Sequence, residues 1–214
     1  MPIISDEIRG DIRGFLEQMQ SPVTVDFYPH PQSPATAPMI QLLNELHELA
    51  PQIQVLEHQG SAQPMAPEIP EDVEGPIATL STTSGLTGIR YLGFPGGHEF
   101  STFLHLLVDL SVQRDITLSA ETQEWLQKLD KPLHLEVFVT SSCPYCPKAV
   151  RLAHEMARVN PQYVVSDMVD SEAFPSMSDR YGIESVPTTI INGRSQEIGA
   201  LAEEELASLI KQSV

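Results

Sequence analysis

Apolar residues alternate, and then recur at helical spacing, along the second half of the chain. The alternation over residues 133–139 predicts a strand, and apolar positions three and four apart over residues 147–158 predict a helix. A second strand is expected over residues 162–169, followed by a connecting helix over residues 171–181. An amphipathic helix before the first strand opens at Ser119, a residue type that favours a helix N-terminus.

A tight turn and a closing helix complete this pattern. The β-prone residues 188–192 and 196–198 flank the dipeptide Asn192-Gly193, which is a strong signal for a two-residue hairpin turn. Apolar residues at helical spacing over 205–210 then predict a final helix. The whole pattern indicates a mixed sheet flanked by helices.

The same layout occurs earlier in the chain, which indicates an internal repeat. Residues 22–33 align with residues 132–143 without a gap, at an offset of 110 positions (143 − 33). Residues 99–104 align with residues 205–210 at an offset of 106 positions (205 − 99), and share a glutamate and apolar positions. Because the same series of elements occurs twice, the chain is interpreted as two copies of one domain.

The predicted fold is therefore α/β, with two tandem domains that each hold a mixed sheet flanked by helices. We place the first domain at residues 1–118 and the second at residues 119–214. The length of 214 residues suits two domains of about 100 residues each. With 41% hydrophobic and 19% charged residues, both are expected to form packed cores.

Composition argues against several kinds of partner. The formal net charge of −17 at pH 7 repels phosphate backbones and anionic lipids, so we expect neither nucleic acid nor a membrane as a partner. No apolar run approaches the roughly 20 residues that span a bilayer, and the first residues lack the basic and apolar blocks of a signal peptide. We therefore expect a cytoplasmic protein.

The candidate chemistry lies in the two cysteines of the chain, Cys143 and Cys146, where the predicted strand gives way to the predicted helix. At such a junction the first cysteine meets unpaired backbone N–H groups and the positive end of the helix dipole, which favour the thiolate. The second cysteine lies one turn later, within reach of a mixed disulfide formed on the first. We predict Cys143 as the nucleophile and Cys146 as the resolving thiol. Pro144 suits a first-turn position, and Lys148 adds positive charge.

Two other interpretations of the cysteines stay open. They could form half of a tetrahedral zinc site, which needs four ligands, and His134 and His154 are the residues that could complete it. Neither histidine has the usual spacing of a zinc motif. The cysteines could also be inert buried thiols, which would leave their joint position at a helix start unexplained. We favour the dithiol and expect no metal.

The motif resembles that of a known superfamily. Cys143-Pro-Tyr-Cys146 after a strand, with Val186-Pro187 further along, is similar to the thioredoxin superfamily, and Cys-Pro-Tyr-Cys is the glutaredoxin form of its motif. Two tandem copies resemble the protein disulfide oxidoreductases of thermophilic prokaryotes. They also resemble the amino-terminal domain of the flavoprotein that reduces bacterial peroxiredoxin. Residues 88–100 are similar to the end of the first domain of those oxidoreductases.

This resemblance implies further site residues. It implies a cis peptide bond before Pro187, which would lie against the dithiol, and a substrate strand that pairs with the backbone of Val186. Pro144 and Tyr145, between the two cysteines, are expected to bind the substrate as well. Together these four residues would surround the sulfurs.

The chain also departs from these families. The first copy has Ser33 and Thr36 at the cysteine positions, and hydroxyls are not redox-active, so we expect a structural or docking role for this domain. Thioredoxins have a buried acid that assists proton transfer, and Val137 occupies its position in this chain. The adjacent Glu136 is therefore a candidate for that role. Glutaredoxins have a lysine shortly before the motif and a Gly-Gly pair after the hairpin, whereas this chain has residues 140–142 (Thr-Ser-Ser) and 199–200 (Gly-Ala) there. This difference favours protein disulfides over glutathione as substrates.

The leading hypothesis is an enzyme that exchanges the Cys143/Cys146 dithiol with disulfides of protein substrates. No Gly-x-Gly-x-x-Gly fingerprint for a flavin or nicotinamide is present, so we expect no bound cofactor. Electrons would then come from a separate reductase or a small thiol. A rival hypothesis is an electron-transfer module between a flavoprotein reductase and a peroxiredoxin. A third is a redox-inactive scaffold or chaperone that uses the cleft between the domains.

Overall fold

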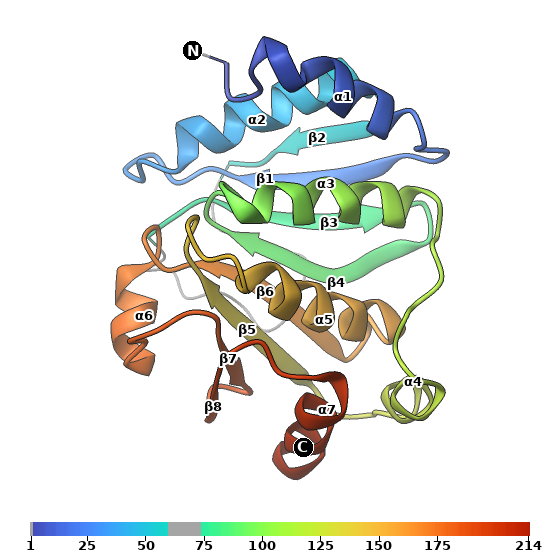
Figure 1. The fold of residues 1–214 in the computed structure, drawn as a ribbon, viewed down its shortest axis with the longest axis vertical. Helices are drawn as coiled ribbons and strands as arrows, with labels where there is room; N and C mark the ends of the chain where they lie inside the picture. Colours follow the sequence, from blue (N-terminus) through green and yellow to red (C-terminus); the bar gives the residue numbers. More distant parts are fainter. Residues whose placement is uncertain (1, 60–73) are drawn as a thin grey trace.

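A computed structural model describes residues 2–59 and 74–214 of the chain. Its strands form one eight-stranded sheet in the order β2-β1-β3-β4-β6-β5-β7-β8 (Figure 1). The strands are β1 (Val23–Tyr28), β2 (Ile53–Glu57), β3 (Ile77–Thr82), β4 (Gly85–Leu92), β5 (Leu133–Val139), β6 (Val164–Asp170), β7 (Thr188–Ile191) and β8 (Ser195–Ile198). The helices are α1 (Asp6–Leu16), α2 (Thr36–Leu49), α3 (His98–Ser111), α4 (Ala120–Gln127), α5 (Cys146–Val159), α6 (Pro175–Tyr181) and α7 (Glu203–Ser213).

Each half of the chain contributes four adjacent strands with the same topology. β1 runs parallel to β2 and antiparallel to β3, which pairs with β4. β5 runs parallel to β6 and antiparallel to β7, which pairs with β8. The helices that follow β1 and β5 begin at Thr36 and Cys146, at the offset of 110 (146 − 36) expected from the repeat. The predicted pair of tandem α/β units with a mixed sheet is therefore confirmed.

The two units join edge to edge into one sheet. β4 of the first unit runs parallel to β6 of the second, with residues 89–92 opposite residues 166–169. Arg90 and Asp167 are opposite each other in this pair, and both side chains are buried. The junction between the halves therefore consists of backbone pairing and a buried pair of opposite charges.

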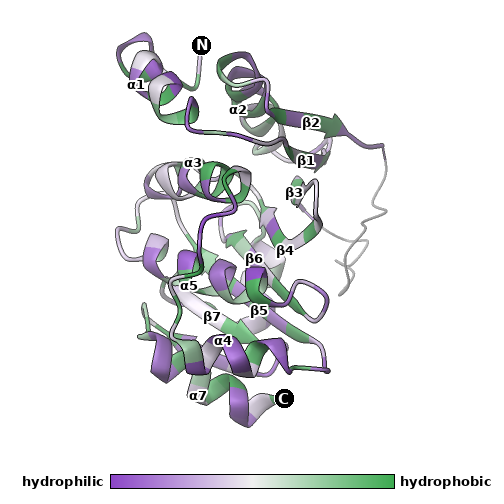
Figure 2. Ribbon diagram, turned by 90° about the vertical axis from the view of Figure 1, so that its right-hand side faces the viewer, coloured by the Kyte–Doolittle hydropathy of each residue, from purple (hydrophilic) through white to green (hydrophobic). Residues whose placement is uncertain are grey.

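Helices cover the two faces of the sheet unequally. Tyr91 and Val137 point into the larger core, to which α2, α3 and α5 contribute buried residues. On the other face Phe174, just before α6, packs in a smaller core with Phe138 of β5, because successive strand residues point to opposite faces. Figure 2 shows hydrophobic and hydrophilic residues side by side along α4 and α7, as expected for helices between a core and solvent.

The second half of the chain follows the predicted elements closely. Ser119 caps α4 by accepting a hydrogen bond from the N–H of Thr122 at 3.2 Å, which confirms the helix start expected there. Asn192 and Gly193 have φ angles of 51° and 65°, as the predicted two-residue hairpin turn requires. The proposed domain boundary near residue 118 falls between α3 and α4, and the division at that residue stays a prediction.

The connecting helix differs most from the prediction. α6 begins at Pro175, four residues later than expected, because the chain first makes a turn. In this turn the N–H groups of Ala173 and Phe174 both donate to the carbonyl of Asp170 at 3.0 Å. None of the helices in residues 2–59 and 74–214 is long and apolar enough to cross a membrane.

Candidate active site around Cys143 and Cys146

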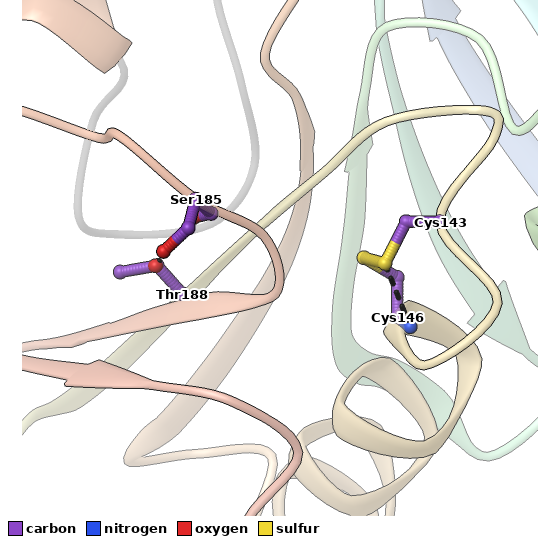
Figure 3. The surroundings of a disulfide bond; sticks show 4 residues. All are labelled: Cys143, Cys146, Ser185 and Thr188. Atoms are coloured by element: carbon purple, nitrogen blue, oxygen red, sulfur yellow. Dashed lines mark hydrogen bonds between the residues drawn. A yellow bond between two sulfur atoms is a disulfide. The ribbon is translucent and has the colours of Figure 1, made fainter.

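The two cysteines form a disulfide at the start of α5 (Figure 3). Their Cα atoms are 5.6 Å apart, which is within the usual range for bonded cysteines. Cys143 lies in the loop after β5 and keeps 7% of its surface exposed, whereas Cys146 is fully buried. A partner molecule therefore meets the sulfur of Cys143 first.

The start of α5 places a hydrogen-bond donor on this outer sulfur. The backbone N–H of Cys146, the first residue of the helix, donates to Sγ of Cys143 at 3.1 Å. The N–H of Cys143 donates to the carbonyl of Thr140 at 3.1 Å, which turns the loop towards the helix. The N–H group and the positive end of the helix dipole both stabilise negative charge on this sulfur. The arrangement therefore favours a thiolate at Cys143 in the reduced protein.

The position expected for Pro144 is wrong by about one helical turn. Because α5 begins at Cys146, Pro144 precedes the helix, and Pro147 takes the place in its first turn. A proline is tolerated there because the N–H groups of the first turn have no partner within the helix. Pro144 and Tyr145 instead lie in a bend between the two sulfurs, with exposed side chains. Their contact with substrate stays a prediction.

A proline turn precedes β7 on the dithiol side of the molecule. The peptide bond between Val186 and Pro187 is cis, as expected. The Thr188 hydroxyl donates to the carbonyl of Ser185 at 2.7 Å and closes the turn, which Figure 3 shows across from the disulfide. Val186 packs against the core cluster that contains both cysteines. The role of Val186 and Pro187 as a substrate platform stays a prediction.

Two contacts link this turn to the first turn of α5. The N–H of Gly199 donates to the carbonyl of Pro187 at 2.8 Å. The Nζ of Lys148 donates to the carbonyl of the next residue, Ala200, at 3.4 Å. The proline turn and the helix that begins at the disulfide are therefore held by one segment after β8.

Two large side chains near the site are left in solvent. Tyr145, between the cysteines, is 71% exposed. Ile198, which is opposite Thr188 in the β7–β8 pair, is 64% exposed. Ile198 was not expected as a site residue, because an isoleucine in a strand pattern is usually part of a core. Tyr145 is therefore exposed between the two cysteines, and Ile198 is exposed next to Gly199, which bonds to the carbonyl of Pro187.

Glu136 lies on the opposite face of β5 from the residues that share the cysteine core. Leu135 and Val137, its neighbours, point into that core. Glu136 is 4% exposed and accepts a hydrogen bond from the Tyr181 hydroxyl at 3.0 Å. Burial raises the pKa of Glu136, and His134 partly offsets this rise. Its partners belong to a separate polar cluster, and its role in proton transfer stays a prediction.

A second buried acid, Glu99, was not singled out as a site residue from the sequence. It lies in the first turn of α3 and is 1% exposed. Among the residues that the structure describes, neither of its carboxyl oxygens has a hydrogen-bond partner of good geometry. Burial raises the pKa of Glu99 to about 7, with a partial offset from Thr102. A carboxyl group of this kind can exchange a proton near neutral pH, as a general acid or base must.

The same turn of α3 contacts the loop that carries Cys143. The N–H of His98 donates to the carbonyl of Ser141 at 3.1 Å. The backbone at Gly97 is so close that a Cβ atom there would collide with the same carbonyl oxygen. Glu99 is the next residue after His98. The first unit therefore contributes a backbone contact to the active-site loop, and the helix turn that makes this contact also carries the buried Glu99.

The first unit keeps the loop geometry of the site without its sulfurs. The Thr36 hydroxyl donates to the carbonyl of His30 at 2.6 Å, and Ser33 is 8% exposed. The N–H of Gly93 donates to the carbonyl of Pro76 at 2.8 Å, which matches the bond at the proline turn of the second unit. A structural or docking role for this unit stays a prediction.

The histidines of the zinc alternative bond to other residues. His134 Nε2 is 2.8 Å from Oδ2 of Asp167, and His154 Nδ1 is 2.8 Å from the hydroxyl oxygen of Ser166. Within the described ranges, no group of three or more His, Cys, Asp or Glu side chains is placed to hold a metal ion. The structure joins the two cysteines to each other and leaves both histidines in separate contacts.

Comparison with known proteins agrees with this geometry. Residues 133–211 match the family described as thioredoxin domain. A thioredoxin of Methanocaldococcus jannaschii is 37% identical over 78 residues, which are 36% of this chain and 92% of that protein. The chain belongs to the thioredoxin family. The residues that match include Cys143 and Cys146, which form the disulfide.

The tandem thioredoxin fold has solved counterparts. A structure of the F component of alkylhydroperoxide reductase from Enterococcus faecalis has a TM-score of 0.83 at 24% identity, with 97% of this chain and 99% of that chain covered. A protein disulfide oxidoreductase from Aeropyrum pernix has a TM-score of 0.80 at 24% identity, with 98% and 93% covered. At this identity the likeness concerns the fold, and it confirms two tandem thioredoxin-like domains.

This thioredoxin-family chain spans only part of its longer curated relatives. It is 24% identical to the F component of alkyl hydroperoxide reductase from Xanthomonas campestris pv. phaseoli. The 206 aligned residues are 96% of this chain and 36% of that protein. It is 28% identical over 120 residues to an NADH dehydrogenase of Bacillus subtilis, which are 56% of this chain and 23% of that protein.

Proposed function

We propose that this thioredoxin-family chain exchanges the Cys143/Cys146 dithiol with disulfides of protein substrates. The observation that carries the proposal is the hydrogen bond of 3.1 Å from the N–H of Cys146 to Sγ of Cys143. It gives the more exposed sulfur a donor that stabilises negative charge, while the buried sulfur is placed to bond to it. A pair of inert thiols would need neither feature.

The proposed reaction begins with the thiolate of Cys143. It attacks one sulfur of a substrate disulfide, so that a mixed disulfide forms and the other substrate sulfur leaves as a thiolate. Cys146 then loses its proton and attacks Cys143, which releases the second substrate sulfur. The substrate gains two electrons, and its thiolates take up the proton of Cys146 and one from solvent. The chain is left with the Cys143–Cys146 disulfide.

We propose that Glu99 accepts the proton that Cys146 loses. Because Cys146 is fully buried, its proton has to pass to a group inside the protein. Glu99 is buried, lacks a hydrogen-bond partner among the described residues, and follows the residue that bonds to the active-site loop. Its pKa of about 7 suits a group that takes up a proton and gives it back. Glu136 is the alternative, but it bonds to Tyr181 on the opposite face of the sheet.

The surroundings of the disulfide favour a protein as the substrate. Tyr145 and Ile198 offer exposed apolar surface on which a folded or extended partner can bury side chains. The exposed backbone before Pro187, at Ser185, and the half-buried Val186 can pair with an extended segment of the partner. Both features suit a polypeptide better than a small thiol.

A second candidate function uses the same site with other partners. In it, a separate flavoprotein reductase reduces the Cys143–Cys146 disulfide, and the dithiol then passes the electrons to a peroxiredoxin. The likeness to the F component of alkyl hydroperoxide reductase over 96% of the chain supports this candidate. The chemistry at Cys143 is the same in both functions, so the partners alone separate them.

Insulin reduction in dithiothreitol tests the proposed function. The wild-type chain is expected to accelerate precipitation of the insulin B chain, and Cys143→Ser and Cys146→Ser are expected to stay at the uncatalysed rate. A wild-type rate equal to that of both variants would overturn the proposal. The variant Cys146→Ala should retain a captured partner as a mixed disulfide on Cys143. A peroxiredoxin as the main captured protein would favour the second candidate.

A further inference from the structure

We propose that the sheet face opposite the dithiol carries a binding site for a small organic anion with an apolar or aromatic body. A cleft of about 820 Å³ lies there, bordered by α6, the β7–β8 turn and the starts of β5 and β6. Cavities of roughly 300–1,000 Å³ are typical of small-molecule sites. The described residues that line it include neither cysteine and no residue of the proline turn. The proposal therefore does not depend on the proposed function.

The rim of this cleft is cationic in a strongly acidic chain. Four of the 12 lysines and arginines line the cleft, although the net charge of the chain is −17. Lys131, Arg180 and Arg194 are exposed. Among the described residues, none of these three lies within 4.0 Å of a carboxylate oxygen. Three cations that converge on one cavity without a carboxylate partner attract an anion.

The acidic side chains of the cleft floor already have hydrogen-bond partners inside the protein. Arg90 donates to both carboxylate oxygens of Asp167, at 2.7 Å each. Glu136 accepts the hydrogen bond from Tyr181, and both acids are less than 5% exposed. The negative groups are therefore buried and bonded, whereas the positive groups of the rim face the open cavity.

Apolar side chains in the cleft favour an organic anion over an inorganic one. Tyr163 and Tyr181 are half-buried and line the cavity together with Leu133 and Met177. A ring or alkyl chain of a ligand can bury against these side chains, while its carboxylate, sulfonate or phosphate group meets a guanidinium. A bare inorganic ion would use only the rim.

A fluorescence titration of the full oxidised chain with 8-anilinonaphthalene-1-sulfonate tests the site. This probe joins one sulfonate to an aromatic body. The double variant Arg180→Glu, Arg194→Glu should raise the dissociation constant about tenfold or more, because two attractive charges become repulsive. The control Arg13→Glu, Lys128→Glu has the same net charge and changes exposed residues that do not line the cleft. It should stay within about twofold of the wild type.

Several outcomes would overturn the proposal. Binding that does not saturate would do so, as would an equal loss of affinity in both double variants. Inorganic sulfate should displace the probe only at concentrations about tenfold or more above those of an unlabelled aromatic sulfonate. Equal potency of the two competitors would contradict the apolar part of the site. If the charge-reversed variant fails to fold, the neutral pair Arg180→Gln, Arg194→Gln provides the same comparison.

Discussion

Arg90 and Asp167 join the two halves of the chain through two parallel hydrogen bonds, from Nε to Oδ1 and from Nη2 to Oδ2, each 2.7 Å long. Arg90 belongs to β4 of the first unit and Asp167 to β6 of the second. Arg90 is 0% and Asp167 1% exposed. Burial alone would raise the pKa of Asp167, but Arg90 and His134 hold it well below its usual value. The pair is therefore ionised at neutral pH.

Breaking this pair should destabilise the whole chain. Asp167→Asn leaves the guanidinium of Arg90 buried without its counter-charge, so we expect the free energy of unfolding to fall by about 3–5 kcal/mol. Glu48→Gln is the control, because the Arg9–Glu48 pair has a similar distance of 2.9 Å but lies in solvent. It should cost about 1 kcal/mol or less. Equal losses for the two variants in urea unfolding would contradict the buried charge pair.

Gly97 should be required where the first unit meets the active-site loop. Its φ angle is +58°, and a Cβ atom there would collide with the carbonyl oxygen of Ser141. Gly97→Ala should therefore lower the free energy of unfolding by about 1–3 kcal/mol and slow insulin reduction. Gly10→Ala is the control, because nothing lies within 4 Å of a Cβ atom at Gly10 in α1. It should raise stability by about 0.5–1 kcal/mol. A loss at both positions would show that close approach to Ser141 is not the cause.

Glu99 should make stability depend on pH in a way that the variant Glu99→Gln does not. Its pKa rises from 4.5 to about 7 on burial, so the folded chain holds a proton between these values that the unfolded chain has lost. The wild type should therefore lose stability relative to Glu99→Gln as pH rises from 4.5 to about 7, with no further change above that range. Urea unfolding of both proteins at about pH 5, 6, 7 and 8 measures this difference. A difference that is the same at both ends of that series would contradict burial of an ionisable Glu99.

Ile198 should matter for protein substrates and not for small disulfides. Ile198→Asp places a charge on the exposed apolar surface beside the proline turn, so kcat/KM for insulin should fall about tenfold. Reduction of a small aromatic disulfide should change by about twofold or less, because such a molecule needs only the sulfur of Cys143. Leu86→Asp is the control, since Leu86 is 41% exposed in the other unit. Parallel losses on both substrates would indicate damage to the dithiol instead of lost docking.

Much of the fold follows from the sequence because the chain repeats its own pattern. The offset of 110 between Ser33 and Cys143 recurs between the observed helix starts, Thr36 and Cys146, since local patterning determines where each strand ends. Pairing of β4 with β6 could not be predicted in this way. It depends on contacts such as Arg90–Asp167, which are 77 residues apart and have no local signal. The late start of α6 also depended on turn hydrogen bonds that residue spacing does not reveal.

The site was predictable where a residue's chemistry and its place in a motif coincide. Cys143, Cys146 and the cis bond before Pro187 come from one motif, and the structure brings the disulfide and the proline turn to one core. Glu99 entered the sequence analysis only through its alignment with Glu205, because its burial depends on tertiary packing that the repeat does not reveal. A glutamate at the start of an otherwise apolar helix was the available signal.

The charge on Cys143 in the reduced chain decides whether this sulfur is the nucleophile. Absorbance at about 240 nm, compared between the reduced wild type, Cys143→Ser and Cys146→Ser near neutral pH, measures the thiolate that each sulfur contributes. We predict that most of the thiolate signal of the wild type is retained in Cys146→Ser and disappears in Cys143→Ser, because the N–H of Cys146 and the start of α5 stabilise that charge. A reduced wild type with no more thiolate absorbance near neutral pH than Cys143→Ser would contradict this assignment.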